Sequence, residues 1–240
     1  MNEILQNKNC LITGASGGIG HEIVKLLAKK GCNLFLTAQN QDKLVQLKKE
    51  LEGINEKIKV EFLSADLTNL EDVLKLIKKI RERFSNIDVL INSAGIFIIK
   101  SLSDSSIEDF EKCHNVNVLA PFLLSKEFSK DMVDKKWGRI VNLGSSSSYS
   151  GFKNGSVYCA TKHSILGISR ALHSELKDDN VRVYCISPAS SKTKMAKIST
   201  DQDFNTFLDP KEVAEFIVFS ISFDKELTIE EARLNRMILK

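Results

Sequence analysis

The sequence predicts a doubly wound α/β fold, in which a parallel sheet of about seven strands carries helices on both faces. Two observations support this fold class. Short apolar runs alternate with longer amphipathic stretches from the first residues onward, which is typical of successive βαβ units. The 240 residues are also 42% hydrophobic and 27% charged, the composition of an ordinary globular protein. Length alone allows one large domain or two small ones.

The expected strands and helices can be placed in order along the chain. Runs with the continuous apolar character of strands buried on both faces span residues 9–13, 33–37, 58–63, 87–92, 139–143 and 181–187. A helical period of apolar residues predicts helices over 18–30, 41–52, 69–84, 105–136 with a break near Pro121, and 156–178. The chain after Gly167 contains no glycine. There a helix is predicted from Asp209 to Phe223, and residues 228–236 are expected to form a closing strand.

Charge and composition exclude several classes of protein. Lys and Arg number 34 against 31 Asp and Glu, a net charge of +3, so no polybasic nucleic-acid-binding arm is expected. No apolar run approaches the ~18 residues that a membrane span needs, and the N-terminal residues lack the apolar core of a signal peptide. We therefore expect a cytoplasmic protein with neither a nucleic-acid nor a membrane partner. Five scattered cysteines and four unpaired histidines predict no disulfide framework and no metal site.

A glycine-rich loop separates the first predicted strand from the first helix. It reads Thr13-Gly-Ala-Ser-Gly-Gly-Ile-Gly20. Gly14 permits a tight turn, Gly18 lets the backbone approach a pyrophosphate, and Gly20 lets the helix pack on the sheet. The N-terminus of the following helix offers unpaired N–H groups and the positive end of a dipole. The loop therefore predicts a dinucleotide-binding site, the alternative being a glycine-rich turn without a ligand.

A tyrosine and a lysine stand one turn apart near the start of the predicted helix 156–178. Tyr158 and Lys162 have the i, i+4 spacing that places two side chains on one face of a helix. A phenol has a reference pKa of ~10, so acid/base work near neutrality needs a neighbouring cation that stabilises the phenolate. Alone, the pair is typical of an ordinary amphipathic helix start. Together with the other motifs, it indicates a catalytic pair.

The order and spacing of these motifs resemble those of short-chain dehydrogenases/reductases, which share the Gly-x-x-x-Gly-x-Gly loop and the Tyr-x-x-x-Lys pair. The resemblance implies a single-domain Rossmann-type fold over residues 1–240. It also implies four catalytic residues, which are Asn117, Ser145, Tyr158 and Lys162. In this family the serine stabilises the oxyanion at the substrate carbonyl, the tyrosine transfers the proton and the lysine lowers the tyrosine pKa. The asparagine holds a water linked to the lysine.

The serine role has competing candidates. Ser145 lies thirteen residues before Tyr158, which is the spacing seen in the family. Ser146, Ser147 and Ser148 follow it directly, and we expect them to be loop residues.

Further segments match the cofactor-binding motifs of the family. Asp66 resembles the aspartate beside the adenine ring, Asn92-Ser-Ala-Gly95 resembles the Asn-Asn-Ala-Gly motif, and residues 188–193 resemble the segment that meets the nicotinamide carboxamide. The implied cofactor-binding residues are Gly14, Ser16, Gly17, Gly18, Ile19, Gly20, Gln39, Asn40, Asp66, Leu67, Asn92, Ala94, Gly95, Tyr158, Lys162, Pro188 and Thr193. The chain departs from the family pattern at Ser93, at Ala189 and in its glycine-free C-terminal segment.

The residues after the second predicted strand bear on the choice of cofactor. An acidic residue at this place binds the ribose 2′-hydroxyl of NAD, whereas a basic one binds the 2′-phosphate of NADP. This chain has Thr37-Ala-Gln-Asn40, with neither. The absence of an acid favours NADP(H), with Gln39 and Asn40 as hydrogen-bond donors and Lys43 within reach. NAD stays the alternative.

These features predict an NADP(H)-dependent oxidoreductase that transfers hydride between nicotinamide and a small-molecule carbonyl or secondary alcohol, with Tyr158 as general acid/base. One alternative is a β-ketoacyl-thioester (3-oxoacyl-carrier-protein) reductase, for which Lys192, Lys194 and Lys197 would supply a basic entrance. Another is a non-catalytic dinucleotide-binding scaffold, because a fold alone does not prove a reaction.

Two further expectations concern the lid and the assembly. Residues 190–208 are expected to form the substrate lid. The family implies a homodimer or homotetramer joined through the predicted helices 105–136 and 156–178, which carry more apolar positions than one sheet face needs.

Overall fold

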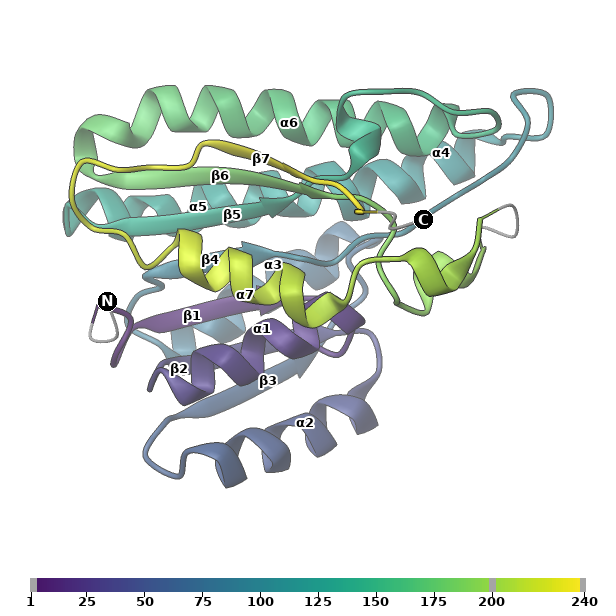
Figure 1. Ribbon diagram of the computed structural model, residues 1–240. Helices are drawn as coiled ribbons and strands as arrows, with labels where there is room; N and C mark the ends of the chain where they lie inside the picture. Colours follow the sequence, from purple (N-terminus) through teal and green to yellow (C-terminus); the bar gives the residue numbers. More distant parts are fainter. Residues whose placement is uncertain (1–3, 199–201, 238–240) are drawn as a thin grey trace.

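The computed structural model describes residues 4–198 and 202–237, which are built around one parallel sheet of seven strands (Figure 1). The strands are β1 Asn9–Thr13, β2 Asn33–Ala38, β3 Val60–Ser64, β4 Val89–Asn92, β5 Gly138–Leu143, β6 Val181–Pro188 and β7 Glu231–Leu234. Their order across the sheet is β3-β2-β1-β4-β5-β6-β7. The sheet therefore grows outward in both directions from β1 and β4. Ligands of such sheets bind in the crevice at this switch point, beyond the carboxyl ends of the strands.

In the same two ranges, seven α-helices flank the sheet (Figure 1). They are α1 Gly18–Lys29, α2 Gln41–Ile54, α3 Leu70–Arg83, α4 Ile107–His114, α5 Ala120–Asp134, α6 Ser156–Leu176 and α7 Pro210–Ser220. α1 packs against α2 and α7, whereas α3 packs against α5 and α4 against α6. Two separate hydrophobic clusters result, one on each face of the sheet. None of the helices in the described ranges is long and apolar enough to cross a membrane.

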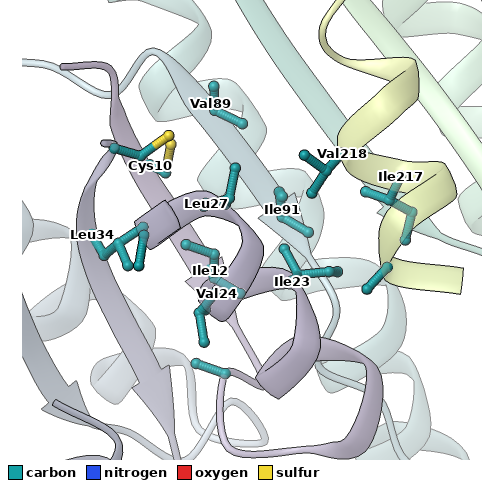
Figure 2. Packing of buried hydrophobic residues seen from close by; sticks show 14 of the residues in the cluster. Cys10, Ile12, Ile23, Val24, Leu27, Leu34, Val89, Ile91, Ile217 and Val218 are labelled. Carbon is teal, nitrogen blue, oxygen red and sulfur yellow. The ribbon is translucent and has the colours of Figure 1, made fainter. Parts of the chain in front are cut away.

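The face covered by α1 and α7 forms a continuous apolar core (Figure 2). Ile12 of β1 and Ile91 of β4 belong to it, together with Ile23 of α1 and Ile217 of α7. Leu11, the neighbour of Ile12, belongs to the cluster on the opposite face, because successive side chains of a strand point to opposite sides. The glycine-free C-terminal segment thus completes the core through α7.

The predicted helix 105–136 is divided differently from the expectation. A π-helical turn, Asn115–Leu119, separates α4 from α5. Pro121 lies in the first turn of α5, where its missing N–H would be unpaired in any case. The interruption therefore precedes the proline, at a turn that contains Asn117. π-helical turns of this kind often occur at functional sites.

The expected lid is a loop whose two ends are held together. The Leu208 N–H donates to the Ser190 carbonyl at 2.9 Å, and the Lys192 N–H donates to the Leu208 carbonyl at 2.8 Å. Two short 3₁₀ turns, Met195–Ile198 and Phe204–Thr206, lie between these points. Residues 199–201 of the expected lid lie outside the described residues.

The predicted closing strand is present as β7, which pairs in parallel with β6 at the edge of the sheet. Two arginines from the amino ends of β5 and β6 hold the connection between α7 and β7. Arg139 donates to the Phe223 carbonyl at 2.9 Å, and Arg182 donates to the same carbonyl at 3.0 Å. Two charged side chains thus hold the connection between α7 and β7 at the amino ends of β5 and β6. The crevice lies at the other end of these strands, at their carboxyl ends.

Candidate active site

A cavity of about 1500 Å³ lies at the carboxyl ends of the strands. It is lined by the glycine loop, the segments that follow β2, β4 and β5, the start of α6, and the lid. The predicted site residues that line it are Gly14, Ser16, Gly17, Gly18, Ile19, Gly20, Gln39, Asn40, Leu67, Ala94, Gly95, Ser145, Tyr158, Lys162, Pro188 and Thr193. Asp66, Asn92 and Asn117 are not among the lining residues. The tertiary structure thus brings sixteen of the predicted site residues, from Gly14 to Thr193, to one cavity.

The glycine loop leaves the start of α1 open. Gly17 occupies the N-cap position, and no side chain caps this helix. By contrast, α2, α3, α4 and α7 are each capped by a side chain, from Asn40, Asn69, Ser106 and Asp209. A helix N-terminus without a side-chain cap presents backbone N–H groups and a partial positive charge. This end of the cavity therefore fits an anionic group such as a pyrophosphate.

Three glycines of this loop, Gly14, Gly18 and Gly20, have no room for a side chain, and a Cβ on Gly20 would overlap the Gly14 carbonyl oxygen. Gly14 has a φ of +64°, and a Cβ there would lie 2.8 Å from the Ala94 backbone. A Cβ on Gly18 would lie 2.6 Å from Cγ2 of Thr193. The loop thus packs directly on the segment after β4 and on the lid. These contacts explain the need for glycine at all three positions.

Tyr158 lies in the first turn of α6, and only 7% of its surface is exposed. Burial raises the pKa of Tyr158 to about 12, and a hydrogen bond with Ser145 acts in the opposite direction. The phenol therefore carries its proton at neutral pH in the free protein. A protonated tyrosine beside an open cavity can donate to an oxygen that gains negative charge.

The structure distinguishes among the four consecutive serines. Ser145 follows the end of β5, and it is the serine whose hydroxyl acts on Tyr158, where it opposes the rise in pKa that burial causes. Its Oγ also accepts from the Ser147 N–H at 3.1 Å. Ser148 is turned inward, and its Oγ accepts from the Ser145 N–H at 3.1 Å. Ser146 and Ser147 line the cavity, but Ser145 is the serine paired with the tyrosine.

Lys162 lies one turn after Tyr158 and is buried, with 6% of its surface exposed. Its Nζ donates to the Leu143 carbonyl at 2.7 Å and lies 5.7 Å from the centroid of the Tyr158 ring. Burial lowers the pKa of Lys162 to about 8. The ammonium is directed to Leu143, and burial dominates the pKa of the phenol.

Asn117 braces the π-helical turn against the segment after β4. Its Oδ1 accepts from the Ile96 N–H at 2.9 Å, and its Nδ2 donates to the Ile96 carbonyl at 3.0 Å and to Thr161 Oγ1 at 3.1 Å. The space around Gly95 joins it to the lysine, because a Cβ on Gly95 would lie 3.3 Å from Asn117 Oδ1 and 3.9 Å from Lys162 Nζ. Asn117 and Lys162 therefore both border Gly95, and the Asn117 amide is already engaged by Ile96 and Thr161.

Asn92 supports the site from below. It is buried, and its Nδ2 donates to Asn142 Oδ1 at 2.8 Å. Asn142 in turn donates to Ser169 Oγ at 3.0 Å. A buried chain of polar side chains thus links β4, β5 and α6 beneath the cavity.

Asp66 and the two amides after β2 form a small network at the other end. Asp66 Oδ1 accepts from the Thr68 N–H at 3.0 Å and from Gln39 Nε2 at 3.1 Å. The hydrogen bond from the Thr68 backbone is the main cause that holds the pKa of Asp66 below its usual value. Asn40 caps α2, its Oδ1 accepting from the Lys43 N–H at 2.9 Å. Both amides are therefore partly used within the protein.

Beside Tyr158 lies an aromatic wall that no sequence motif predicted. The ring of Phe97 meets the Tyr158 ring edge-on, with centroids 4.6 Å apart, and lies 6.0 Å from the ring of Phe152. Phe97 and Phe152 both line the cavity. Neither belongs to a motif, and the sequence signal was only the apolar run after Gly95, at residues 96–99.

Comparison with known proteins agrees with this geometry. The sequence profile described as short chain dehydrogenase matches residues 8–203. An uncharacterized oxidoreductase of Staphylococcus saprophyticus is 31% identical over 227 residues, which cover 95% of this chain and 96% of that one.

Solved structures of the same kind superpose closely on the whole chain. An alcohol dehydrogenase of the archaeon Thermococcus sibiricus, complexed with 5-hydroxy-NADP, is 29% identical with a TM-score of 0.86, over 96% of this chain and 97% of that one. A short-chain dehydrogenase of Sphingobium yanoikuyae, in complex with NADPH, is 28% identical with a TM-score of 0.84, over 93% and 87% of the two chains. With the profile match across most of its length, the chain belongs to the short-chain dehydrogenase family and is an oxidoreductase with a Rossmann-like fold.

Proposed function

We propose that this oxidoreductase transfers hydride between NADP(H) and a carbonyl or secondary alcohol, with Tyr158 as the general acid/base. One observation carries the proposal. A single cavity joins the open N-terminus of α1 to the cluster of Ser145, Tyr158 and Lys162. One end thus fits a dinucleotide pyrophosphate, and the other holds a proton donor. A bound nicotinamide dinucleotide supplies or accepts the hydride.

The side chains divide the remaining work. In the reduction direction, Ser145 Oγ orients the substrate carbonyl and stabilises the negative charge that develops on its oxygen. Tyr158 Oη gives its proton to that oxygen. Lys162, one turn below, stabilises the phenolate that is left, because an opposite charge nearby favours the ionised form. The raised pKa of Tyr158, about 12 in the free protein, keeps the proton in place until this step.

The proposed cofactor contacts follow from the shape of the cavity. The first-turn N–H groups of α1 would hold the pyrophosphate, and Gly95 and Thr193 would border the nicotinamide half. The preference for NADP(H) rests on Lys43, which lines the cavity beside Gln39 and Asn40. Its ammonium would attract the 2′-phosphate. We expect Lys43→Ala to weaken NADPH binding by roughly 5- to 10-fold and to leave NADH binding unchanged, as measured by fluorescence titration.

Tyr158→Phe tests the central assignment. The variant keeps the ring packing against Phe97 but removes the proton donor. We expect turnover of a reducible ketone to fall by about 10²- to 10⁴-fold, while NADPH binding, measured by fluorescence, stays within about 2-fold of the wild-type value. Wild-type turnover in the variant would contradict the proposal. Tight NADPH binding without turnover of any ketone by the wild-type protein would favour a non-catalytic scaffold.

The lysines of the lid favour a second candidate, a β-ketoacyl-thioester reductase. Lys192, Lys194 and Lys197 are exposed, and the first two line the cavity. They would attract an acidic carrier protein. Replacing all three by serine should lower kcat/KM for a carrier-bound substrate far more than for a free ketone if this candidate is correct.

The lid, domain and assembly assignments belong to the same proposal. We propose that residues 190–208 close over the substrate, that the chain acts as one dinucleotide-binding domain, and that copies associate through α4, α5 and α6. Light scattering after size-exclusion chromatography distinguishes a monomer from the proposed dimer or tetramer.

A further inference from the structure

The substrate end of the cavity is more apolar and more aromatic than the cofactor end. Phe97 lies directly against Tyr158, and Phe152 extends this wall outward. From the lid, Met195 and Ile198 line the same cavity. The exposed fractions of Phe152, Met195 and Ile198 are 42%, 37% and 53%. Exposed apolar side chains that share one cavity indicate a ligand that covers them.

The aromatic wall is held in place by the backbone. The Lys100 N–H donates to the Asn154 carbonyl at 2.9 Å, which joins the segment of Phe97 to the segment of Phe152. The Gly155 N–H donates to the Phe152 carbonyl at 3.1 Å. Gly155 also makes room for the ring, because a Cβ there would lie 2.7 Å from Cε1 of Phe152. The wall is therefore largely formed before a ligand binds, which lowers the cost of ordering it.

The geometry restricts where a substrate substituent can lie. The carbonyl oxygen must reach both Tyr158 and Ser145 for the proposed reaction. Its carbon then lies beside Phe97, so a substituent on that carbon meets the Phe97–Phe152 wall and the lid residues opposite. The neighbouring lysines, Lys153 and Lys194, are exposed and can keep their ammonium groups in water. An apolar substituent can therefore enter this part of the cavity without removing the lysine ammonium groups from water.

We infer that the substrate is a ketone, or the matching secondary alcohol, that carries an aromatic ring next to the reacting carbon. This inference rests on the proposed function and adds a substrate class to it. Phe97 and Phe152 already touch at a tilted angle of 50°, so a third ring packs against the open side of Phe152. Aromatic rings gain from such offset or edge-to-face contacts beyond the burial of their area, which a linear alkyl chain of equal size does not.

Two methyl ketones of equal carbon number test the inference, acetophenone and 2-octanone, each assayed with NADPH. In the wild-type protein we expect kcat/KM for acetophenone to exceed that for 2-octanone by about 10-fold. Phe152→Ala should bring this ratio close to about 1. Gly155→Ala, which keeps every ring but displaces Phe152, should lower the ratio in the same direction. The matched control is Phe219→Ala on α7, since Phe219 is 49% exposed, pairs with Phe223 and does not line the cavity.

The outcomes separate this inference from the proposed function. A ratio near 1 or below in the wild-type protein, or a ratio that Phe152→Ala leaves unchanged, overturns the inference alone if both ketones are turned over and Tyr158→Phe abolishes turnover. Absence of turnover with every ketone overturns the proposed function and the inference together. A ratio that falls in both wall variants and not in Phe219→Ala supports the aromatic substrate.

Discussion

Two buried cations lie at opposite ends of β5, and they differ in the number and kind of their hydrogen-bond partners. At the amino end, Arg139 is fully buried and donates to the Phe223 carbonyl at 2.9 Å and to Asp224 Oδ1 at 2.7 Å, with the Trp137 ring 4.4 Å away. At the carboxyl end, Lys162 donates to one carbonyl, that of Leu143. Burial lowers the pKa of both groups, in the case of Lys162 to about 8.

Burial serves two purposes at the two ends of β5, where Arg139 belongs to the strand itself and Lys162 to α6, which lies beside it. Arg139 has a carboxylate, backbone carbonyls and an aromatic face as partners, so its charge is neutralised and it fixes the C-terminal segment. Among the described residues, Lys162 has one hydrogen-bond acceptor, the Leu143 carbonyl, and it faces a cavity. A desolvated cation with few partners is costly, and such groups are concentrated at functional sites. The first cation therefore holds the C-terminal segment, whereas the second lines the cavity and uses one hydrogen bond, to the Leu143 carbonyl.

The largest expected effect is on activity, from Lys162→Met. The variant removes the cation beside Tyr158, so we expect kcat for a ketone to fall by about 10²- to 10⁴-fold. The free energy of unfolding in urea should be unchanged or higher at pH 7, because a desolvated charge is removed. Lys153→Met, at an exposed lysine of the same cavity, is the control and should keep most of the activity. A lysine with a structural role would instead give an unstable protein.

Arg139→Met should have the opposite profile. It removes the Arg139 hydrogen bonds to the Phe223 carbonyl and to Asp224, which keep Arg182 and Trp137 Nε1 as donors. Because several buried hydrogen bonds are lost together, we expect the free energy of unfolding to fall by about 3 kcal/mol. The kcat of the folded fraction should stay within about 2-fold of the wild-type value, because this end of β5 is far from the cavity. Urea unfolding and a ketone assay on the same sample measure both. A large loss of kcat without loss of stability would contradict the structural role assigned to Arg139.

The pH dependence of stability comes next in size. The pKa of Lys162 falls from 10.5 in the unfolded chain to about 8 in the folded protein. Between these values the unfolded chain binds more protons, so the stability of the wild-type protein should rise with pH relative to Lys162→Met, by about 2 kcal/mol from pH 8 to pH 9.5. Urea unfolding of both proteins without cofactor measures the difference. Parallel curves for the two proteins would show that Lys162 is not desolvated.

The smallest effect is expected for Asp224→Asn. This change keeps an acceptor for Arg139 and for Trp137 Nε1, which lies 2.8 Å from Asp224 Oδ1, but removes the charge. Because Asp224 is 41% exposed, the loss should be about 1 kcal/mol. Asp179→Asn, at a partner of the exposed Lys136, is the control and should cost less than about 0.5 kcal/mol. An equal loss in the free energy of unfolding for both variants would mean that burial of Arg139 does not strengthen its ion pair with Asp224.

The helix boundaries show how far local pattern extends. The strand Asn9–Thr13 and the start of α1 at Gly18 agree with the sequence prediction, because hydrophobic runs and glycines act over a few residues. The break in helix 105–136 was placed near Pro121, but it lies at the π-helical turn 115–119. Within that turn, Asn117 is hydrogen-bonded to Ile96 in the segment after β4. A contact between residues 21 positions apart leaves no local pattern.

The sequence by itself predicted the family, the cavity-lining loop and the grouping of Ser145, Tyr158 and Lys162, because these motifs are short and keep a fixed spacing along the chain. Only the tertiary structure decided the protonation of that cluster and the surroundings of the substrate. Burial sets the pKa values of Tyr158 and Lys162, and burial is a property of the whole packing. The wall of Phe97 and Phe152 likewise forms between two loops that are distant in the sequence and are joined by a hydrogen bond from Lys100 to Asn154.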